Sequence, residues 1–230
     1  LEGNVSEAGT LQNILPKIST ATKNPVIVTD AGIGTQENVD WLADNKYRYI
    51  VVSRKRKKEI PDDNKMVKVR EDDRRVIKAA IRTCDDGETE VCCHSSAKEI
   101  KERGIKTRFE RRFEDQLTIA RDALYKKGGT KKYDKVLERI GRLKEKYRRV
   151  ASGYEISVEK DSQSDSASNI TWSMKEVDDT SGYYVLRSNL KRADEREIFD
   201  IFNMLLDLED AFRSMKSELG LRPVHHQTES

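Results

Sequence analysis

The sequence predicts a mixed α/β fold, and three patterns along the chain support that prediction. β-branched runs near residues 26 and 49 flank a helix-like segment. Strand-like alternation and helical stripes follow in the middle of the chain. A long segment near the end carries apolar residues at helical spacing. Because a strand–helix–strand unit of this spacing favours a parallel crossover, we expect the first two strands to be parallel neighbours.

The first unit starts at Asn24-Pro-Val-Ile-Val-Thr-Asp30-Ala-Gly-Ile-Gly34, a β-branched run that ends in an acid and two glycines. Thr35 is a suitable N-cap for the next helix, and residues 47–53 are the next strand. Asp30 therefore lies at the carboxyl end of a strand, where ligands of open α/β sheets bind. A role as a turn residue or a helix cap would explain Asp30 equally well.

The middle of the chain, roughly residues 55–190, is interpreted as an inserted module. Segments 74–83 and 89–94 flank Asp85-Asp-Gly87, which suits a hairpin turn. Four potential zinc ligands lie in this region: Cys84, Cys92, Cys93 and His94. Their spacing matches no standard zinc knuckle, and adjacent strand residues point to opposite faces. We therefore favour buried or idle thiols over a zinc site.

A helical hairpin is expected next. Residues 96–127 show a helical stripe formed by Phe113, Leu117, Ala120 and Leu124. Gly128-Gly129 ends this helix, and apolar residues then recur at spacings of three and four from 133 to 150. Two such helices joined by a glycine turn predict an antiparallel hairpin. Its outward cations would either contact DNA or only keep the hairpin soluble: Lys131, Lys132, Lys135, Arg139, Arg142, Lys146, Arg148 and Arg149.

Three further strands are predicted before the last helix. Segments 154–158 and 170–174 alternate apolar and polar residues around a polar loop at 160–168. Residues 182–189 form the third strand, which leads into the last helix. Trp172 is assigned to the core rather than to a surface on which bases would stack.

In the last predicted helix, an acidic and a basic residue point in nearly the same direction. Its apolar stripe is formed by Ile198, Ile201, Phe202, Leu205, Leu208, Phe212, Met215 and Leu219. Glu209 lies on this stripe, and an inward carboxylate is costly unless it is paired or binds a cation. Lys216 follows two turns later, about 10 Å along the axis. The alternative is a surface ion pair with Arg213, four residues after Glu209.

Composition narrows the class of protein without identifying it. The 230 residues carry 44 Lys and Arg against 41 Asp and Glu, a formal net charge of +3. Basic residues occur in blocks, and one block at Arg54, Lys55, Arg56 and Lys57 suits either a DNA backbone or a solvated face. With no run of 18 apolar residues and three cysteines, we expect a cytoplasmic protein without membrane contact.

Several segments, taken in order, resemble a known family. They are Leu1-Glu-Gly-Asn-Val-Ser-Glu7, Val26-Ile-Val-Thr-Asp30-Ala-Gly32, Gly182-Tyr-Tyr-Val-Leu-Arg-Ser-Asn189, and Leu208-Glu-Asp-Ala-Phe-Arg-Ser-Met-Lys216 with Leu221-Arg-Pro-Val224. These segments resemble the DDE transposases of bacterial insertion sequences, in the IS-four group. The resemblance runs along nearly the whole chain.

The resemblance implies a ribonuclease H-like catalytic core interrupted by a long mixed α/β insertion that contains the helical hairpin. Asp30 matches the second catalytic Asp and Glu209 the catalytic Glu. Together they would bind Mg²⁺ or Mn²⁺ for DNA cleavage and strand transfer by a two-metal mechanism. Lys216 fits the family's helix signature and would contact a phosphate of the transposon end. Arg213 would orient Glu209 or bind phosphate.

Two departures from the family pattern affect this interpretation. Phe202 and Leu205 replace a Tyr and an Arg of the helix signature, so the phosphate contacts of those positions are not implied here. No acid in a comparable strand precedes Asp30 as a counterpart of the first catalytic Asp. We therefore interpret the chain as an internal fragment, with part of the core at 1–58, the insertion at 59–189 and the catalytic helix at 190–230.

The implied partners are DNA, as transposon ends and target, and a second copy of the full-length protein. The implied location is the cytoplasm, in association with the nucleoid. Arg54, Lys55, Arg56 and Lys57 would be non-specific contacts to the DNA backbone. Two alternatives stay open, a ribonuclease H-like nuclease without strand transfer and a catalytically dead DNA-binding remnant. The chain by itself is expected to be inactive.

Overall fold

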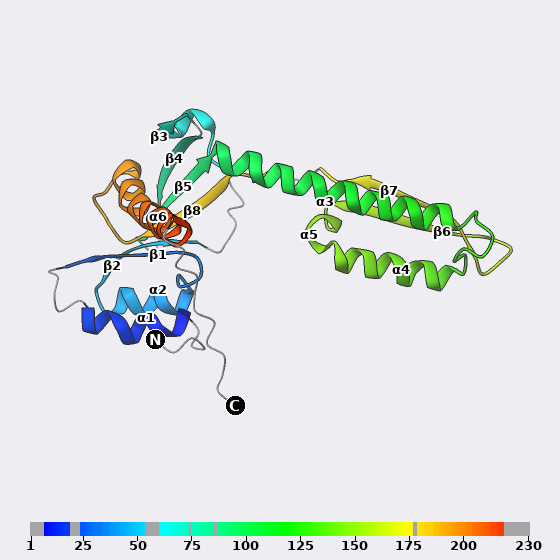
Figure 1. Ribbon diagram of the computed structural model, residues 1–230, viewed down its shortest axis with the longest axis horizontal. Helices are drawn as coiled ribbons and strands as arrows, with labels where there is room; N and C mark the ends of the chain where they lie inside the picture. Colours follow the sequence, from blue (N-terminus) through cyan, green and yellow to red (C-terminus); the bar gives the residue numbers. More distant parts are fainter. Residues whose placement is uncertain are drawn as a thin grey trace. The chain divides into compact units, whose positions relative to one another are not determined.

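The computed structural model describes residues 7–18, 24–53, 60–73, 75–84, 87–176 and 179–218. Within these residues the protein is mixed α/β, with a curled mixed sheet and six α-helices (Figure 1). By contacts the chain divides into two compact units. We call Leu1–Ala97 with Tyr183–Ser230 the sheet unit and Lys98–Gly182 the hairpin unit.

The sheet unit contains six strands in the order β1-β2-β8-β5-β4-β3. In chain order they are β1 (Val26–Thr29), β2 (Arg48–Val52), β3 (Val67–Asp72), β4 (Arg75–Thr83), β5 (Thr89–Ser95) and β8 (Tyr183–Ser188). β1 and β2 are parallel and are joined by α2 (Gln36–Asp44), which confirms the predicted crossover. The other neighbouring strands are antiparallel. A 3-10 turn, Asp63–Lys65, precedes β3.

Helices cover both faces of this sheet (Figure 1). α1 (Glu7–Ile18) and α2 pack on one face, where Leu15 and Leu42 join a core with Val51 of β2. α6 (Glu195–Glu218) packs on the other face, through a core that contains Phe199 and Ile50. Neighbouring residues of β2 thus serve opposite cores, as strand alternation requires. Over the described residues, no helix is both long enough and apolar enough to cross a membrane.

Local signals in the sheet unit produce the predicted elements. Thr35 caps α2, because its Oγ1 accepts a hydrogen bond from the N–H of Asn38 at 3.2 Å. β4 and β5 form the predicted antiparallel hairpin, from Ile77 opposite Ser95 at its open end to Thr83 opposite Thr89 beside the turn. Gly87 takes a positive φ of 80° near the turn, a conformation that glycine adopts without strain. Asp85 and Asp86 lie outside the described residues.

The hairpin unit is one continuous segment of helices followed by a β-hairpin. Its elements are α3 (Ser96–Ala123), α4 (Tyr133–Lys146), α5 (Arg148–Ala151), β6 (Tyr154–Lys160) and β7 (Ala167–Met174). The predicted stripes of the two long helices meet in one core, which confirms the helical hairpin. The second helix is shorter than predicted, because Tyr147 leaves helical geometry (φ −108°, ψ 32°) and separates α4 from α5.

The two predicted strands are confirmed as β6 and β7, which pair in antiparallel register and extend further than the alternating pattern indicated. Trp172 on β7 packs partly buried against the core of the hairpin unit. The guanidinium of Arg121 lies 5.1 Å from the centre of its ring. The assignment of Trp172 to the core therefore agrees with its packing, although one side of the ring contacts a cation.

The two units divide the chain at other positions than the family resemblance implied. Residues 67–95 and 183–188, which we assigned to the insertion, form strands in the same sheet as β1 and β2. The hairpin unit begins soon after β5 and ends just before β8. Those two strands are paired, with His94 opposite Tyr183, so the chain leaves and re-enters the sheet unit at neighbouring positions.

Candidate active site

Asp30 stands directly after β1, at the start of the loop that leads to α2. Its Oδ1 accepts hydrogen bonds from the backbone N–H groups of Gly32 at 2.9 Å and Ile33 at 3.0 Å. The residue is exposed to solvent. The structure thus places Asp30 at the predicted strand end and also shows the turn role that the sequence left open.

The two glycines after Asp30 allow this loop to close on the acid. A Cβ on Gly32 would lie 3.1 Å from Asp30 Oδ1, and a Cβ on Gly34 would lie 2.9 Å from the Asp30 carbonyl oxygen. The Gly34 N–H donates to that same carbonyl at 2.9 Å. Backbone groups therefore orient the carboxylate, while its exposure keeps it accessible to a ligand.

Glu209 lies on the same face of α6 as the residues that pack against the sheet, but beyond the last of them. It stands seven residues after Phe202, and at 100° per residue the two point within about 20° of each other. Phe202 is only 5% exposed, whereas Glu209 and all described side chains from 207 to 215 are exposed. The expected inward, buried position of Glu209 was wrong, because the cover of the sheet over α6 ends near Leu206.

The apolar stripe around Glu209 is also exposed rather than buried. Leu208 and Phe212 are 57% and 58% exposed. Leu205, by contrast, is partly buried and packs against the core between α6 and the sheet. The periodicity of the stripe gave the direction of Glu209 correctly, but periodicity carries no information on where the opposing sheet stops.

The remaining predicted site residues are only partly described. Arg213 contacts Asp210, with 3.0 Å between Nη1 and Oδ1. Both side chains of this pair are largely exposed, so it contributes little to stability. Lys216 belongs to α6, but its side chain is outside the described part of the structure. Four further predicted DNA contacts lie outside the described residues: Arg54, Lys55, Arg56 and Lys57.

β1 alternates between the two cores up to its end. Val26 and Val28 pack with the core under α6, whereas Ile27 packs with the core of α1 and α2. Asp30 follows the last residue of the strand, and its carboxylate accepts hydrogen bonds from the backbone of Gly32 and Ile33. The turn, rather than the strand alternation, therefore sets the direction of this carboxylate.

An open cleft of about 760 Å³ lies between the first turns of α6 and the beginning of β1. Val26 and Arg48, at the beginnings of β1 and β2, line it together with Asp200 and Ile201 of α6. From Val26 to Asp30 the strand advances about 13 Å. From Ile201 to Glu209 the helix advances about 12 Å. Neither acid lines the cleft, which lies at the other end of β1 from Asp30.

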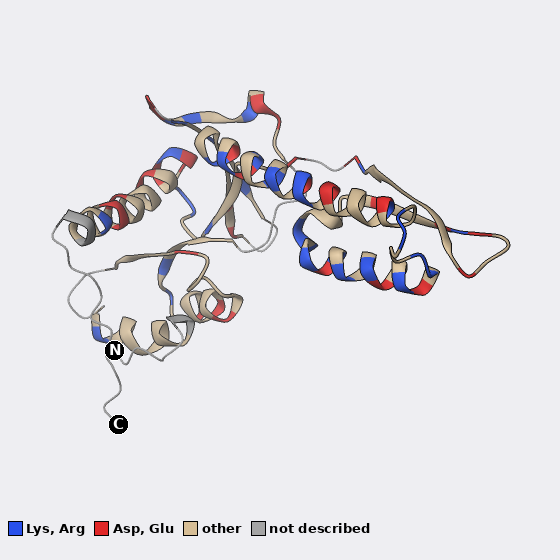
Figure 2. Cartoon of the chain, turned by 45° about the vertical axis from the view of Figure 1, so that its right-hand side comes forward, with Lys and Arg blue, Asp and Glu red and all other residues tan. Residues whose placement is uncertain are grey.

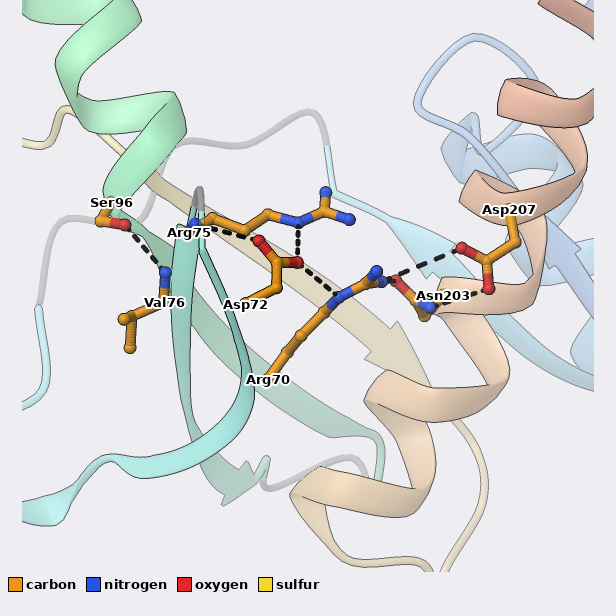
Figure 3. A network of polar contacts seen from close by, with 7 residues as sticks. All are labelled: Arg70, Asp72, Arg75, Val76, Ser96, Asn203 and Asp207. Atoms are coloured by element: carbon orange, nitrogen blue, oxygen red, sulfur yellow. Dashed lines mark hydrogen bonds and ion pairs between the residues drawn. The ribbon is translucent and has the colours of Figure 1, made fainter. Parts of the chain in front are cut away.

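A polar network attaches α6 to β3 (Figure 3). Arg70 contacts Asn203 through Nη1, and that nitrogen lies 3.9 Å from Asp207 Oδ1. Arg70 Nε also lies 3.3 Å from Asp72 Oδ2. Asp207 is about 160° around the helix from Glu209. The network therefore holds α6 from the flank opposite the candidate catalytic acid. Nothing in the sequence pattern indicated it, because β3 was not predicted as a strand.

A second network holds the start of α2, just after the Asp30 loop. Glu88 accepts hydrogen bonds from Arg187 Nε and from the Tyr49 hydroxyl, both at 2.7 Å. Arg187 also donates to the side chain of Gln36, the first residue of α2, at 3.0 Å. Burial lowers the pKa of Arg187, but the hydrogen bond and charge of Glu88 outweigh it and raise the pKa. Arg187 belongs to the segment Gly182–Asn189 that carries the family resemblance, but the sequence alone assigned it no role.

Cys92 and Cys93 lie on β5, where both side chains are buried. Among the described residues, no group of three or more His, Cys, Asp or Glu side chains is placed to hold a metal ion. The ring of His94 packs 4.4 Å from that of Tyr183. Burial, with the neighbouring Cys93 thiol, raises the pKa of Tyr184. These residues belong to the packing of β5 against β8.

Comparison with known proteins adds no relative: no protein-family model, no curated protein and no solved structure matches the chain. The function must therefore be inferred from the residues and their geometry.

Proposed function

We propose that the sheet unit carries part of the catalytic centre of a DDE transposase, which cleaves DNA and transfers strands with Mg²⁺ or Mn²⁺. The observation that supports this most is the placement of Asp30 and Glu209. Both acids are exposed and belong to the same unit, Asp30 directly after β1 and Glu209 on α6.

The chemistry of these two side chains suits the proposed ion. Carboxylate oxygens are the donors that Mg²⁺ prefers, and exposed carboxylates keep room for water and phosphate ligands. Asp30 is oriented by backbone groups through Oδ1, so metal binding would not have to order a mobile side chain. When bound, the ions supply Lewis acidity to the nucleophile and the leaving oxygen of a phosphodiester.

A third carboxylate is needed to complete the family's centre. β1 is an edge strand of the described sheet, so a further strand carrying an acid has an open position beside it. Among the residues that the structure describes, no third potential ligand groups with Asp30 and Glu209. We therefore expect weak metal binding and very weak Mg²⁺-dependent cleavage by the 230-residue chain alone.

The shared ion is tested by Mn²⁺ titration of the 230-residue chain, followed by electron paramagnetic resonance. Asp30→Asn and Glu209→Gln should each lower Mn²⁺ affinity at least about tenfold, because each removes a charge that holds the ion. The double variant should lose little more than either single variant, since both acids serve one ion. Asp210→Asn, an exposed acid one residue away, is the matched control. Independent, additive losses in the double variant would refute a shared site.

The two alternative functions are separated by a different assay. A labelled DNA end incubated with Mn²⁺, a circular target and the chain extended by an upstream strand that carries the third acid reports cleavage and joining separately. A ribonuclease H-like nuclease would nick the DNA without joining the end to the target. A DNA-binding remnant would bind the end without either reaction. Joined product that disappears in Glu209→Gln is the result expected of a transposase.

A further inference from the structure

Seven of the eight charged residues of α4 are sorted by sign into two stripes, and the eighth, Lys144, lies on the flank opposite the cations. At 100° per residue, four cations fall within an arc of about 60°. They are Lys135, Arg139, Arg142 and Lys146, and we call them the α4 cation row. Three acids fall on the neighbouring flank, within about 40°: Asp134, Glu138 and Glu145. The remaining flank carries Val136, Ile140 and Leu143, which are buried in the hairpin unit.

This sorting is unfavourable for an isolated helix. Successive members of the row stand three or four residues apart, so each cation faces another of the same sign. Glu138 offsets part of this repulsion, because it contacts Lys135 at 3.2 Å and also pairs with Arg142. Lys135 and Arg142 nevertheless stay 66% and 77% exposed. A helix surface that served only solubility would mix positive and negative residues, because mixing avoids this repulsion.

The row also cannot be explained by membrane binding. An interfacial helix inserts an apolar flank beside its cations. The apolar flank of α4 is already occupied, since Val136 and Ile140 are 2% and 4% exposed. Leu137 is the large exposed apolar residue among those described on α4, and it lies on the far flank from the row. What α4 presents at the row is positive charge, with the ring of Tyr147 lying 5.6 Å from the ammonium group of Lys146.

We propose that the α4 cation row binds the phosphate backbone of duplex DNA. The row extends about 16 Å along the helix, which corresponds to about five base steps at 3.4 Å per step. Figure 2 shows basic residues, coloured blue, on successive turns of the α4 ribbon. No base-reading geometry is implied, so the row supplies affinity rather than sequence preference. The proposal rests on the proposed function, which makes DNA the substrate.

The test compares two four-residue variants of the full 230-residue chain that have the same net charge. The row variant carries Lys135→Gln, Arg139→Gln, Arg142→Gln and Lys146→Gln. The control variant carries Lys101→Gln, Arg108→Gln, Arg111→Gln and Arg112→Gln, all exposed on α3. Fluorescence anisotropy with a labelled 25-base-pair duplex, about the length of a typical binding site, gives the affinity at several salt concentrations.

The row variant should flatten the slope of log K against log salt by about 3.6, because each lost phosphate contact removes about 0.9. The control variant should change the slope by much less. Glu138→Gln should strengthen binding, since it removes the acid that competes for Lys135 and Arg142. Equal slopes for the row and control variants would overturn the proposal. So would row-dependent binding to phosphatidylserine vesicles as strong as that to DNA.

Failure of this inference is distinguishable from failure of the proposed function. Mn²⁺ titration of the row variant measures metal binding by Asp30 and Glu209 when the α4 cation row is absent. Intact Mn²⁺ binding with unchanged DNA affinity would refute the row alone. The Trp172 emission of the row variant, matched to that of the unchanged chain, confirms that the hairpin unit is folded, because Trp172 packs against its core.

Discussion

The two units of this chain build their cores over different distances in the sequence. The hairpin unit closes its core within the continuous segment Lys98–Gly182. The sheet unit needs both parts of the chain, since β8 from the second part lies between β2 and β5 from the first. Contacts that are local in sequence form at a lower entropic cost of loop closure than distant ones. The hairpin unit should therefore depend far less on the rest of the chain.

The same difference separates the two candidate functional surfaces. Asp30 and Glu209 are held in one unit by strand pairing and by α6, which lie far apart in sequence. The α4 cation row follows from the geometry of one helix. A disturbance of the sheet unit should therefore impair metal binding while DNA contacts of the hairpin unit persist. Changes made in one unit can test this separation.

The largest effect is expected from removing a buried aromatic ring. Phe113 is fully buried in the hairpin unit, with its ring 5.6 Å from that of Tyr147 and 5.3 Å from that of Tyr154. Phe113→Ala should destabilise the hairpin unit by about 3–5 kcal/mol, through lost burial and the cavity left behind. Phe199→Ala, at a 1% exposed position, should do the same to the sheet unit.

The two tryptophans report the units separately, because Trp41 belongs to the sheet unit and Trp172 to the hairpin unit. Urea unfolding of Trp41→Phe and Trp172→Phe backgrounds, followed by fluorescence, gives one transition for each unit. Phe113→Ala should lower the midpoint seen by Trp172 and leave that of Trp41 nearly unchanged. Equal shifts of both midpoints would show that the units unfold together.

An intermediate effect is expected from the ion pair beneath α2. The side chains of Arg187 and Glu88 are 18% and 10% exposed, and Glu88 also accepts from Tyr49. Arg187→Met should destabilise the sheet unit by about 1–3 kcal/mol, because it leaves a largely buried carboxylate with one partner fewer. The Trp41 midpoint should fall and the Trp172 midpoint should not.

Arg82→Met is the control for this ion pair. Arg82 contacts Glu90 at 2.7 Å in the same sheet, but its side chain is 52% exposed. Its loss should cost at most about 1 kcal/mol, since water screens exposed pairs. A loss for Arg82→Met as large as that for Arg187→Met would mean that charge rather than burial sets the effect.

Local features of both units were predictable from the sequence, and distant ones were not. The cap at Thr35, the β4–β5 hairpin and the stripe around Phe113 depend on residues a few positions apart. The sheet order and the Arg70 network depend on β3 meeting α6, more than 120 residues later. Glu209 depends on both local and distant features. The helical period predicts the face of α6 on which it lies, whereas its exposure depends on how far the sheet extends under the helix.

The smallest effect is expected at Asp179, where the hairpin unit ends. Asp179 Oδ1 accepts from the Ser181 N–H at 3.1 Å, and Oδ2 lies 2.8 Å from Arg103 Nε of α3. The hydrogen bonds from Ser181, with Arg103 adding to them, lower the pKa of Asp179 to about 2. A carboxyl group whose pKa is lowered by folding stabilises the folded state at pH values above its unfolded pKa of about 3.9. That stabilisation is lost as the pH falls through the folded pKa.

Asp179→Asn should therefore lower the Trp172 midpoint slightly above pH 4, and the difference from the unchanged chain should shrink toward pH 2. The effect stays small because the side chain is 35% exposed and its partner Arg103 is 57% exposed. Glu176→Gln, an exposed acid in the same unit, controls for the change in net charge. A Trp41 midpoint that moved with pH in the same way would tie this terminal contact to the sheet unit. A difference between Asp179→Asn and the unchanged chain that did not depend on pH would show that the amide disrupts the turn itself rather than removing a charge.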